Sequence, residues 1–205
     1  MSLLVVGSIA LDTLTTPAGK VEDTLGGSAV YFSLAACSYY RIRVVGFVGP
    51  DFPLTEKRFL EERNIDTGGL MTGQGPTFRW EGVYGEDFGD ARTIRTALGV
   101  FASFSPTIPE SFTDTPCVFL ANIDPLLQLQ VIEQVRNPEW IAMDTMNLWI
   151  DIDPDGPVGL AHTFQDRFLI INAQMTFQGM ADRIFQKISQ LVDGNLFSHG
   201  CIVHF

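Results

Sequence analysis

The sequence predicts an α/β fold built on a mainly parallel sheet. Short apolar runs alternate along the chain with segments of helical character, which is the pattern of repeated strand–helix–strand units. Residues 3–7 form a nearly continuous apolar run, as expected of a strand that is covered on both faces. With 205 residues, the chain is long enough to bury a full core, and we expect a single domain over residues 1–205.

The first half of the chain supplies a strand at 3–7, a helix at 28–38, a strand at 44–48 and a helix at 54–63. Small residues in the first helix, Ala29, Ala35 and Ala36, would let it approach the sheet closely. The second helix is rich in charged residues, so we expect it at the surface.

The second half continues the alternation. The apolar run at 118–121 is a strand candidate, and a helix follows at 125–135, with Pro125 in its first turn. Strand candidates at 140–144, 168–171 and 202–205, with a helix at 180–192, would complete the sheet.

One segment departs from this alternation of strands and helices, and its pattern predicts an antiparallel hairpin. Residues 77–84 and 93–98 alternate in polarity around a turn at 85–91. With the stretch after Asp12, it would form a small β-sheet lid, from elements at about 11–25 and 77–98, over the carboxyl edge of the main sheet. The alternative is a surface hairpin with no role in binding.

A glycine pair, Gly26 and Gly27, opens the helix within the stretch LGGSAVYFSLAAC. Glycine has no Cβ, so the backbone here can approach a ligand closely, and the free N–H groups of the first helical turn can bind polar groups. The alternative is a plain tight turn.

Polar side chains gather where strands end, at the edge where open α/β sheets bind ligands. Asp12 follows the first strand, and its carboxylate suits the vicinal hydroxyls of a sugar. Asn122 and Asp124 follow the strand at 118–121, although capping of the next helix explains Asp124 equally well. For residues 144–147, which include Asp144, Thr145 and Asn147, a structural role in the loop is an even alternative.

Three motifs together resemble the amino-terminal part of the ribokinase-like (PfkB) family of sugar and nucleoside kinases. They are G-S-x-x-x-D at 7–12, the pair at Gly26 and Gly27, and V-V-G-x-V-G-x-D at 44–51. The resemblance implies a three-layer sandwich with a β-sheet lid and covers about the first 150 residues. The tail at 151–205 departs from the family, and the carboxyl-terminal part that carries the G-A-G-D motif is missing.

The resemblance also implies the roles of individual residues. It assigns substrate binding to Asp12, Gly26 and Gly27, and nucleotide binding to Asn172. From their places on the hairpin and at strand ends, Arg79, Asn122 and Asn147 are further candidates for substrate binding. Arg79 and Trp80 alternate on one strand, so one would face the ligand and the other solvent, unless both serve lid packing. Tyr31 stands where the family often has Asn, which leaves the identity of the sugar or nucleoside open.

ATP and Mg²⁺ are the cofactors that the family implies. Met175 occupies the Glu position of the family's N-x-x-E motif, and a thioether cannot order metal-bound water, so we expect their binding by this chain to be impaired. The family would transfer a phosphoryl group from ATP to an alcohol, but its catalytic base and anion hole would lie beyond Phe205. We therefore expect this chain alone to be inactive. The alternative is a non-catalytic sugar-binding or dimerisation module, with a homodimer through the lid.

Other classes of function are less compatible with the sequence. The net charge of −11 argues against binding nucleic acid or an anionic membrane. No G-x-G-x-x-G motif supports a nicotinamide-dependent oxidoreductase. Three dispersed cysteines and no signal peptide predict a reducing, cytoplasmic location. His199 and Cys201 would share one face of a terminal strand, whereas His204 would lie on the other face, and a fourth ligand is not evident. We therefore expect no metal site at these residues.

Overall fold

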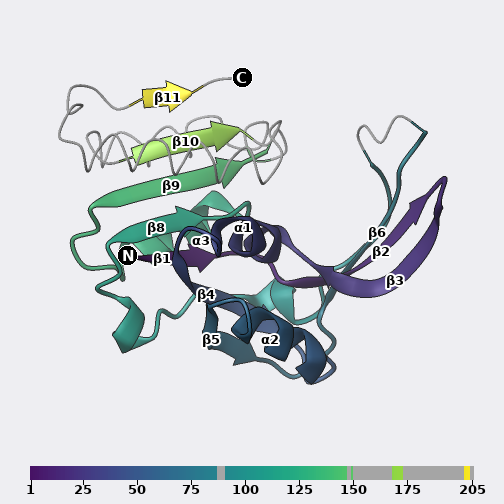
Figure 1. The fold of residues 1–205 in the computed structure, drawn as a ribbon, viewed down its shortest axis with the longest axis horizontal. Helices are drawn as coiled ribbons and strands as arrows, with labels where there is room; N and C mark the ends of the chain where they lie inside the picture. The colour runs from purple at the N-terminus through teal and green to yellow at the C-terminus, as the bar shows by residue number, and fades with distance from the viewer. Residues whose placement is uncertain (87–90, 147–148, 150–167, 173–200, 204–205) are drawn as a thin grey trace.

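The computed structural model describes residues 1–86, 91–146 and 149, together with strands at 168–172 and 201–203. Two β-sheets organise these residues (Figure 1). The larger sheet has seven strands in the order β11-β10-β9-β8-β1-β4-β5, and every pairing is parallel. Its strands are β1 (Ser2–Val6), β4 (Arg41–Val48), β5 (Ile65–Thr72), β8 (Cys117–Leu120), β9 (Trp140–Thr145), β10 (Phe168–Asn172) and β11 (Cys201–Val203).

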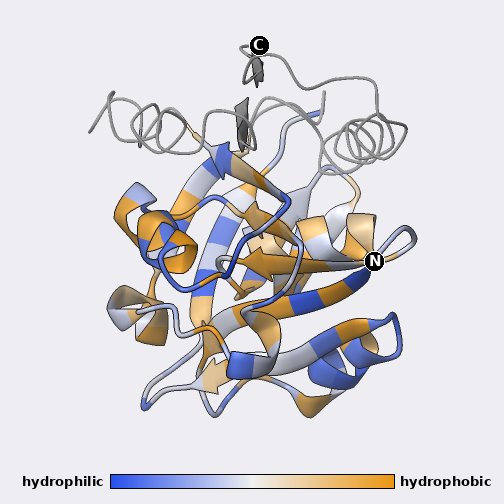
Figure 2. Cartoon of the chain, turned by 90° about the vertical axis from the view of Figure 1, so that its left-hand side faces the viewer, coloured by the Kyte–Doolittle hydropathy of each residue, from blue (hydrophilic) through white to orange (hydrophobic). Residues whose placement is uncertain are grey.

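Both faces of the larger sheet are covered, because successive side chains of each buried strand point to opposite sides. Leu3 and Val5 of β1 pack under α1 (Ser28–Ala36) and α2 (Leu54–Glu61). Leu4 and Val6 pack on the other face, with α3 (Pro125–Ile132) and two 3₁₀ helices, η1 (Gly99–Ser103) and η2 (Glu110–Phe112). The colouring of Figure 2 shows this apolar interior. The predicted three-layer α/β fold is therefore confirmed.

Close packing joins α1 to the sheet. The rings of Phe32 on α1 and Phe119 on β8 are stacked with their centroids 3.5 Å apart, and both side chains are fully buried. Burying an aromatic side chain of this size stabilises a fold by about 1.5–3 kcal/mol. This contact fixes α1 against β8 in the larger sheet.

The start of α3 shows how local sequence sets an element boundary. The Asp124 side chain accepts a hydrogen bond from the backbone N–H of Leu126 at 2.9 Å, and Pro125 opens the helix. Of the two roles considered for Asp124, capping is the one that the structure shows.

The second sheet has four strands in the order β3-β2-β6-β7 and projects beyond the carboxyl end of β1 (Figure 1). Its strands are β2 (Ala10–Thr16), β3 (Gly19–Gly26), β6 (Phe78–Val83) and β7 (Arg92–Ala97). The outer pairs are antiparallel and the central pair, β2 with β6, is parallel. The hairpin predicted from polarity alternation is thus confirmed as β6 and β7.

Some elements differ from those expected. The strand β5 was not expected, because Gly68 and Gly69 interrupt its apolar pattern, yet it pairs with β4 at the edge of the sheet. The helices α1, α2 and α3 each end two or three residues before the expected boundary. The helix expected at 180–192, as well as Asn147, His199 and His204, lies outside the described residues.

Candidate acceptor-binding site

Three loops meet at the carboxyl edge of the larger sheet. The Ser8 hydroxyl, after β1, accepts a hydrogen bond from the Ser28 N–H at 3.0 Å, and the two serine hydroxyls lie 3.0 Å apart. The Ser28 hydroxyl in turn donates to the Asn122 carbonyl, after β8, at 3.2 Å. These contacts tie the ends of β1 and β8 to the first residue of α1.

The glycine pair lies directly beside Asp12. A Cβ placed on Gly26 would lie 2.0 Å from Oδ2 of Asp12, and one placed on Gly27 would lie 2.4 Å from the Ser8 carbonyl oxygen. Gly27 also has a φ of 96°, which L residues with a side chain rarely adopt. Asp12, Gly26 and Gly27, which we call the acceptor cradle, are therefore in close contact and leave no room for a side chain at either glycine.

Burial controls the charge of Asp12. Only 5% of the residue is exposed, and this burial raises the pKa of its carboxyl group from 3.8 to about 6. Hydrogen bonds from the Tyr31 hydroxyl, at 3.2 Å, and from the Gly27 N–H act in the opposite direction by stabilising the carboxylate. Near neutral pH, Asp12 is thus a mostly ionised acceptor of hydrogen bonds in a poorly hydrated place.

The register of the second sheet decides which side chains share a face with Asp12. Asp12 pairs with Trp80 across β2 and β6, whereas Leu11 pairs with Arg79. Since side chains alternate along a strand, Trp80 lies on the same face as Asp12, and Arg79 lies on the opposite face. The structure therefore does not bring Arg79 together with the acceptor cradle.

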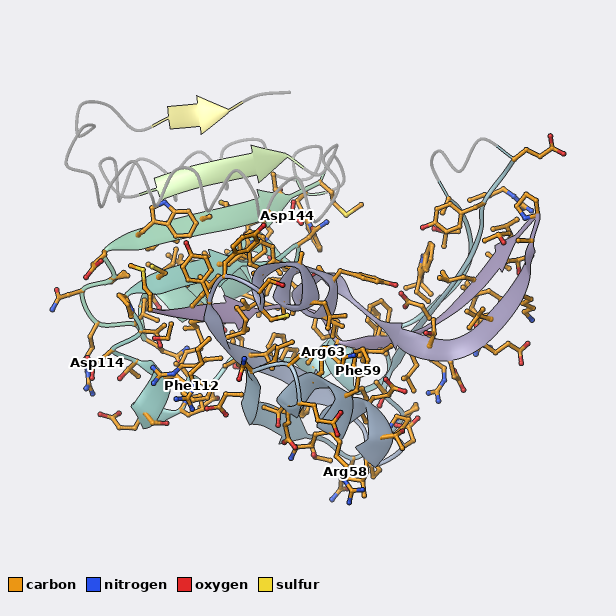
Figure 3. All side chains as sticks on the ribbon, in the orientation of Figure 1. Arg58, Phe59, Arg63, Phe112, Asp114 and Asp144 are labelled. Atoms are coloured by element: carbon orange, nitrogen blue, oxygen red, sulfur yellow. The ribbon has the colours of Figure 1, made fainter. Side chains whose placement is uncertain are left out.

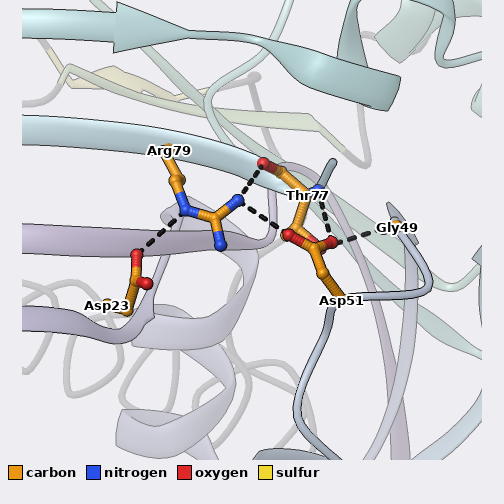
Figure 4. A network of polar contacts seen from close by, with 5 residues as sticks. All are labelled: Asp23, Gly49, Asp51, Thr77 and Arg79. Atoms are coloured by element: carbon orange, nitrogen blue, oxygen red, sulfur yellow. Dashed lines mark hydrogen bonds and ion pairs between the residues drawn. The ribbon is translucent and has the colours of Figure 1, made fainter. Parts of the chain in front are cut away.

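Arg79 instead takes part in a polar network that joins the two sheets (Figure 4). Its guanidinium donates to Asp23 of β3 at 2.9 Å and to Asp51, in the loop after β4, at 2.8 Å. Asp51 also accepts hydrogen bonds from the N–H and the hydroxyl of Thr77, at 2.7 and 2.8 Å. Although burial by itself would raise it, these donors hold the pKa of the Asp51 carboxyl below its ordinary value.

The three predicted asparagines have different outcomes. The side-chain oxygen of Asn122 accepts a hydrogen bond from the Trp149 indole at 2.9 Å, beside the serine pair. Asn172 ends β10, where its backbone pairs with Thr145. Of these two described asparagines, Asn122 is the one linked to the cradle, through the bond of its backbone carbonyl to Ser28, whereas Asn147 lies outside the described residues.

A second buried acid lies at the end of β9 (Figure 3). Asp144 is 2% exposed, and burial raises the pKa of its carboxyl group to about 7, against a backbone hydrogen bond from Thr145. Its Oδ1 has no hydrogen-bond partner in the part of the chain that the structure describes. Gln128 of α3 donates to the Asp144 carbonyl at 3.0 Å and so orients this strand end.

Within the described ranges, no group of three His, Cys, Asp or Glu side chains is arranged to hold a metal ion. Among those same residues, no helix combines the length and the apolarity that a membrane span requires.

Sequence reasoning missed two aromatic features of the site. Tyr31 appeared only as a departure from the family pattern, yet its hydroxyl binds Asp12. For Trp80, the sequence predicted only that it lies on the strand face opposite Arg79, and not which of the two faces the ligand. The strand register that places it beside Asp12 is a tertiary property, so no local signal could have identified it.

Comparisons with known proteins agree with this fold. The described chain resembles the nucleoside kinase of Methanocaldococcus jannaschii, an archaeal member of the ribokinase family, with a TM-score of 0.61 and 15% identity over 95% of this chain and 65% of that one. A nucleoside kinase of Burkholderia thailandensis, solved with inosine, matches with a TM-score of 0.63 and 12% identity over 83% of this chain and 60% of that one. Other similar structures include a ribokinase of Cryptococcus neoformans and an adenosine kinase of Sinorhizobium meliloti.

A curated relative adds sequence similarity. The cytidine kinase of Thermococcus kodakarensis is 26% identical over 139 residues, which are 66% of this chain and 49% of that protein. No family profile matches the chain. The chain thus spans about half the length of this relative, and its fold is that of the ribokinase family of sugar and nucleoside kinases.

Proposed function

From this ribokinase fold, we propose that the chain carries the acceptor-binding part of a sugar or nucleoside kinase. The observation that supports the proposal is the contact of the buried Asp12 carboxylate with Gly26 and Gly27 at the carboxyl edge of the sheet. The cytidine kinase relative and the nucleoside kinase solved with inosine point to the same class of small molecule.

The chemistry of the cradle suits a polyhydroxylated molecule. An ionised carboxylate accepts hydrogen bonds from two neighbouring hydroxyl groups, and charge-assisted bonds of this kind are stronger than neutral ones. The bare backbone at Gly26 and Gly27 lets a sugar ring approach within contact distance. The second sheet, which extends from the same edge, would limit the access of water to the bound molecule.

In a kinase of this kind, ATP with Mg²⁺ would supply the phosphoryl group that a hydroxyl of the bound acceptor receives. Asn172 lies at the end of β10, and β8 and β9 separate this strand from β1. A nucleotide bound at Asn172 would therefore lie along the same sheet edge as the acceptor, two strands beyond the end of β8. The role of this chain's described residues is to bind and orient the acceptor. We propose that the chain alone binds an acceptor without turning it over, since Met175 replaces the expected Glu.

Calorimetric titration of the purified chain with ribose, cytidine and inosine would test the acceptor role. We expect at least one of them to bind, and the substitution Asp12→Asn to weaken binding by about 10-fold or more, because loss of a hydrogen bond to a charged group costs about 1.5–3 kcal/mol. The matched control is Asp114→Asn, a carboxylate 72% exposed in the turn before β8, which should leave binding unchanged.

The outcomes separate the proposed function from its alternative. If no acceptor binds, or if Asp12→Asn and Asp114→Asn behave alike, the acceptor role is wrong. A non-catalytic assembly module would then be favoured, because the second sheet exposes apolar side chains such as Val21 and Ile94 that a second copy could cover.

A further inference from the structure

The strand β5 forms one edge of the larger sheet, and no strand pairs with its outer side among the residues that the structure describes (Figure 1). The Ile42 N–H of β4 donates to the Asn64 carbonyl at 3.1 Å, just before β5 begins. Because the backbone groups of successive residues in a strand point to opposite sides, those of Ile65 and Thr67 point outward. They are placed to bind the backbone of another extended segment.

Two cavities follow this edge of the sheet. The larger, of about 630 Å³, lies at the amino ends of β4 and β5, on the sheet edge opposite the acceptor cradle. The smaller, of about 270 Å³, lies at the carboxyl ends of the same two strands. Lys57 of α2 lines both cavities, so together they form one groove that runs from Arg41 past Lys57 to Leu54, which we call the β5 groove.

The two carboxylates of the larger cavity already have close hydrogen-bond donors. Asp66 accepts a hydrogen bond from the Gly68 N–H at 3.0 Å, and Glu61 accepts one from the Thr67 hydroxyl at 2.5 Å. The bond to Glu61 of α2 shows that the Thr67 side chain lies on the α2 side of the sheet. Since side chains alternate along a strand, Asp66 lies on the opposite side.

The two cations of this cavity are held more loosely than the carboxylates. The Arg41 guanidinium lies 3.6 Å from the Asp66 carboxylate, and its side chain is 67% exposed. The Lys57 ammonium lies 3.9 Å from the Glu61 carboxylate, and its side chain is 44% exposed. Both distances are longer than a hydrogen bond. Each cation is therefore able to pair with a further anion, one on each side of the sheet edge.

The smaller cavity adds an apolar surface at the other end of the groove. It is lined by Leu54, which is 71% exposed, together with Phe52 and Leu70. A strand rises about 3.3 Å per residue, so Leu70 lies about 13 Å along β5 from Asp66. An apolar side chain three or four residues away from the charged end of a bound segment would cover Leu54.

We propose that the β5 groove binds an extended acidic segment of a partner protein, with two adjacent carboxylates on Arg41 and Lys57 and an apolar side chain beside Leu54. Adjacent residues of an added strand point to opposite faces, which matches cations on the two sides of the edge. The backbone of the segment pairs with Ile65 and Thr67, as in other strand additions. Because the chain has a net charge of −11, the preference for acidic residues comes from these local contacts.

Fluorescence polarisation with a labelled peptide tests this inference on the intact chain. The probe Leu-Thr-Val-Asp-Glu-Val-Thr-Leu carries adjacent acids between two apolar residues, so it fits the groove in either direction. We expect a Kd below about 1 mM, as for a small and transient interface, and binding at least about 5-fold weaker when Asn-Gln replaces Asp-Glu. Methylation of alternate peptide nitrogens of the probe, which prevents strand pairing, should abolish binding.

Substitution of the cations locates the site. Arg41→Met and Lys57→Met should each weaken binding of the acidic probe by about 3- to 5-fold, since exposed ion pairs contribute modestly, and should change the affinity for the Asn-Gln peptide by less than about 2-fold. Arg58→Met is the matched control, because Arg58 is an exposed cation of the same helix that lines neither cavity (Figure 3). This variant should bind the acidic probe within about 2-fold of the intact chain.

Hydrogen exchange provides a second readout that depends on no variant. The probe should slow exchange of the Ile65 and Thr67 amides and leave those of β7 unchanged. The inference is wrong if the probe does not bind, if the Asn-Gln peptide binds equally well, or if these amides are not protected. It is also wrong if Arg58→Met weakens binding as much as Lys57→Met. The charges and the irregular register of β5 would then only protect a sheet edge, and the acceptor role of the cradle would be unaffected.

Discussion

At Gly26, the difference between a hydrogen atom and a methyl group decides where the Asp12 carboxylate can lie. The site for a Cβ is only 2.0 Å from Oδ2 of Asp12, well inside van der Waals contact. The same carboxylate carries the bond from Tyr31, so a displacement at Gly26 would also break this hydrogen bond. The acceptor cradle thus depends on the absence of a side chain at Gly26, as it also does at Gly27.

Substitution of this glycine tests the cradle at the residue scale. We expect Gly26→Ala to lower ribose or nucleoside affinity by about 10-fold or more and the free energy of unfolding by about 1–3 kcal/mol, because the methyl group must push the carboxylate aside. Calorimetric titration and chemical unfolding measure the two effects. Gly68→Ala, on the remote strand β5, would place its Cβ no closer than 3.1 Å to a neighbouring atom and should change binding little. Equal affinities of the two variants would contradict the predicted geometry.

At the scale of elements, the network of Arg79 connects the second sheet to the larger one. Asp23 belongs to β3, Arg79 to β6 and Asp51 to the loop that follows β4. The pairs are partly exposed, and exposed ion pairs contribute only about 0–1 kcal/mol. The hydrogen bonds from Thr77 add to them, because they hold Asp51 at the point where β6 begins. We infer that this network sets the angle of the second sheet rather than the affinity for an acceptor.

A double-mutant cycle with Arg79→Met and Asp51→Asn would measure this connection. We expect a coupling energy of about 0.5–1 kcal/mol in the free energy of unfolding. The amides of β6 and β7 should exchange hydrogen faster in Arg79→Met. Ribose affinity should change by less than about 3-fold, because Arg79 lies on the sheet face opposite Asp12. If Arg79→Met weakens ribose binding as much as Asp12→Asn does, Arg79 contacts the acceptor, as the alternation of side chains along the hairpin strand allowed.

For the molecule as a whole, two buried acids and a large negative charge make stability depend on pH. Burial raises the pKa of Asp12 to about 6 and that of Asp144 to about 7, whereas an Asp in an unfolded chain titrates near 3.8. Between these values, the folded protein binds more protons than the unfolded chain, so its stability falls as pH rises. The net charge of −11 at neutral pH acts in the same direction through self-repulsion.

Thermal and chemical unfolding as a function of pH would test this linkage. We expect the free energy of unfolding to fall by about 1–3 kcal/mol between pH 5.5 and 7.5, since one unit of pKa shift corresponds to about 1.4 kcal/mol. Asp144→Asn should flatten this dependence most, because a carboxyl group with a pKa of about 7 stays protonated over more of the interval than one with a pKa of about 6, and Asp12→Asn should flatten it less. Stability that rises with pH over this range would be inconsistent with buried, protonatable acids.

Local sequence patterns predicted the α/β class, most of the strand and helix positions and the hairpin of the second sheet. These follow from apolar periodicity and from glycine and proline positions, which act over a few neighbouring residues. The sequence also indicated Asp12 and the glycine pair, because these residues lie at recognisable junctions between elements. Local patterns were insufficient for β5, where Gly68 and Gly69 interrupt the apolar run.

Only the tertiary structure decided which side chains meet. The bond between Tyr31 and Asp12 joins a helix to a strand, and the register of β2 with β6 places Trp80 beside Asp12 and Arg79 on the opposite face. A shift of one residue in this register would exchange the two faces without changing any local pattern. Strand register depends on packing between segments that lie far apart in the chain, and this is why the composition of the site required the folded molecule.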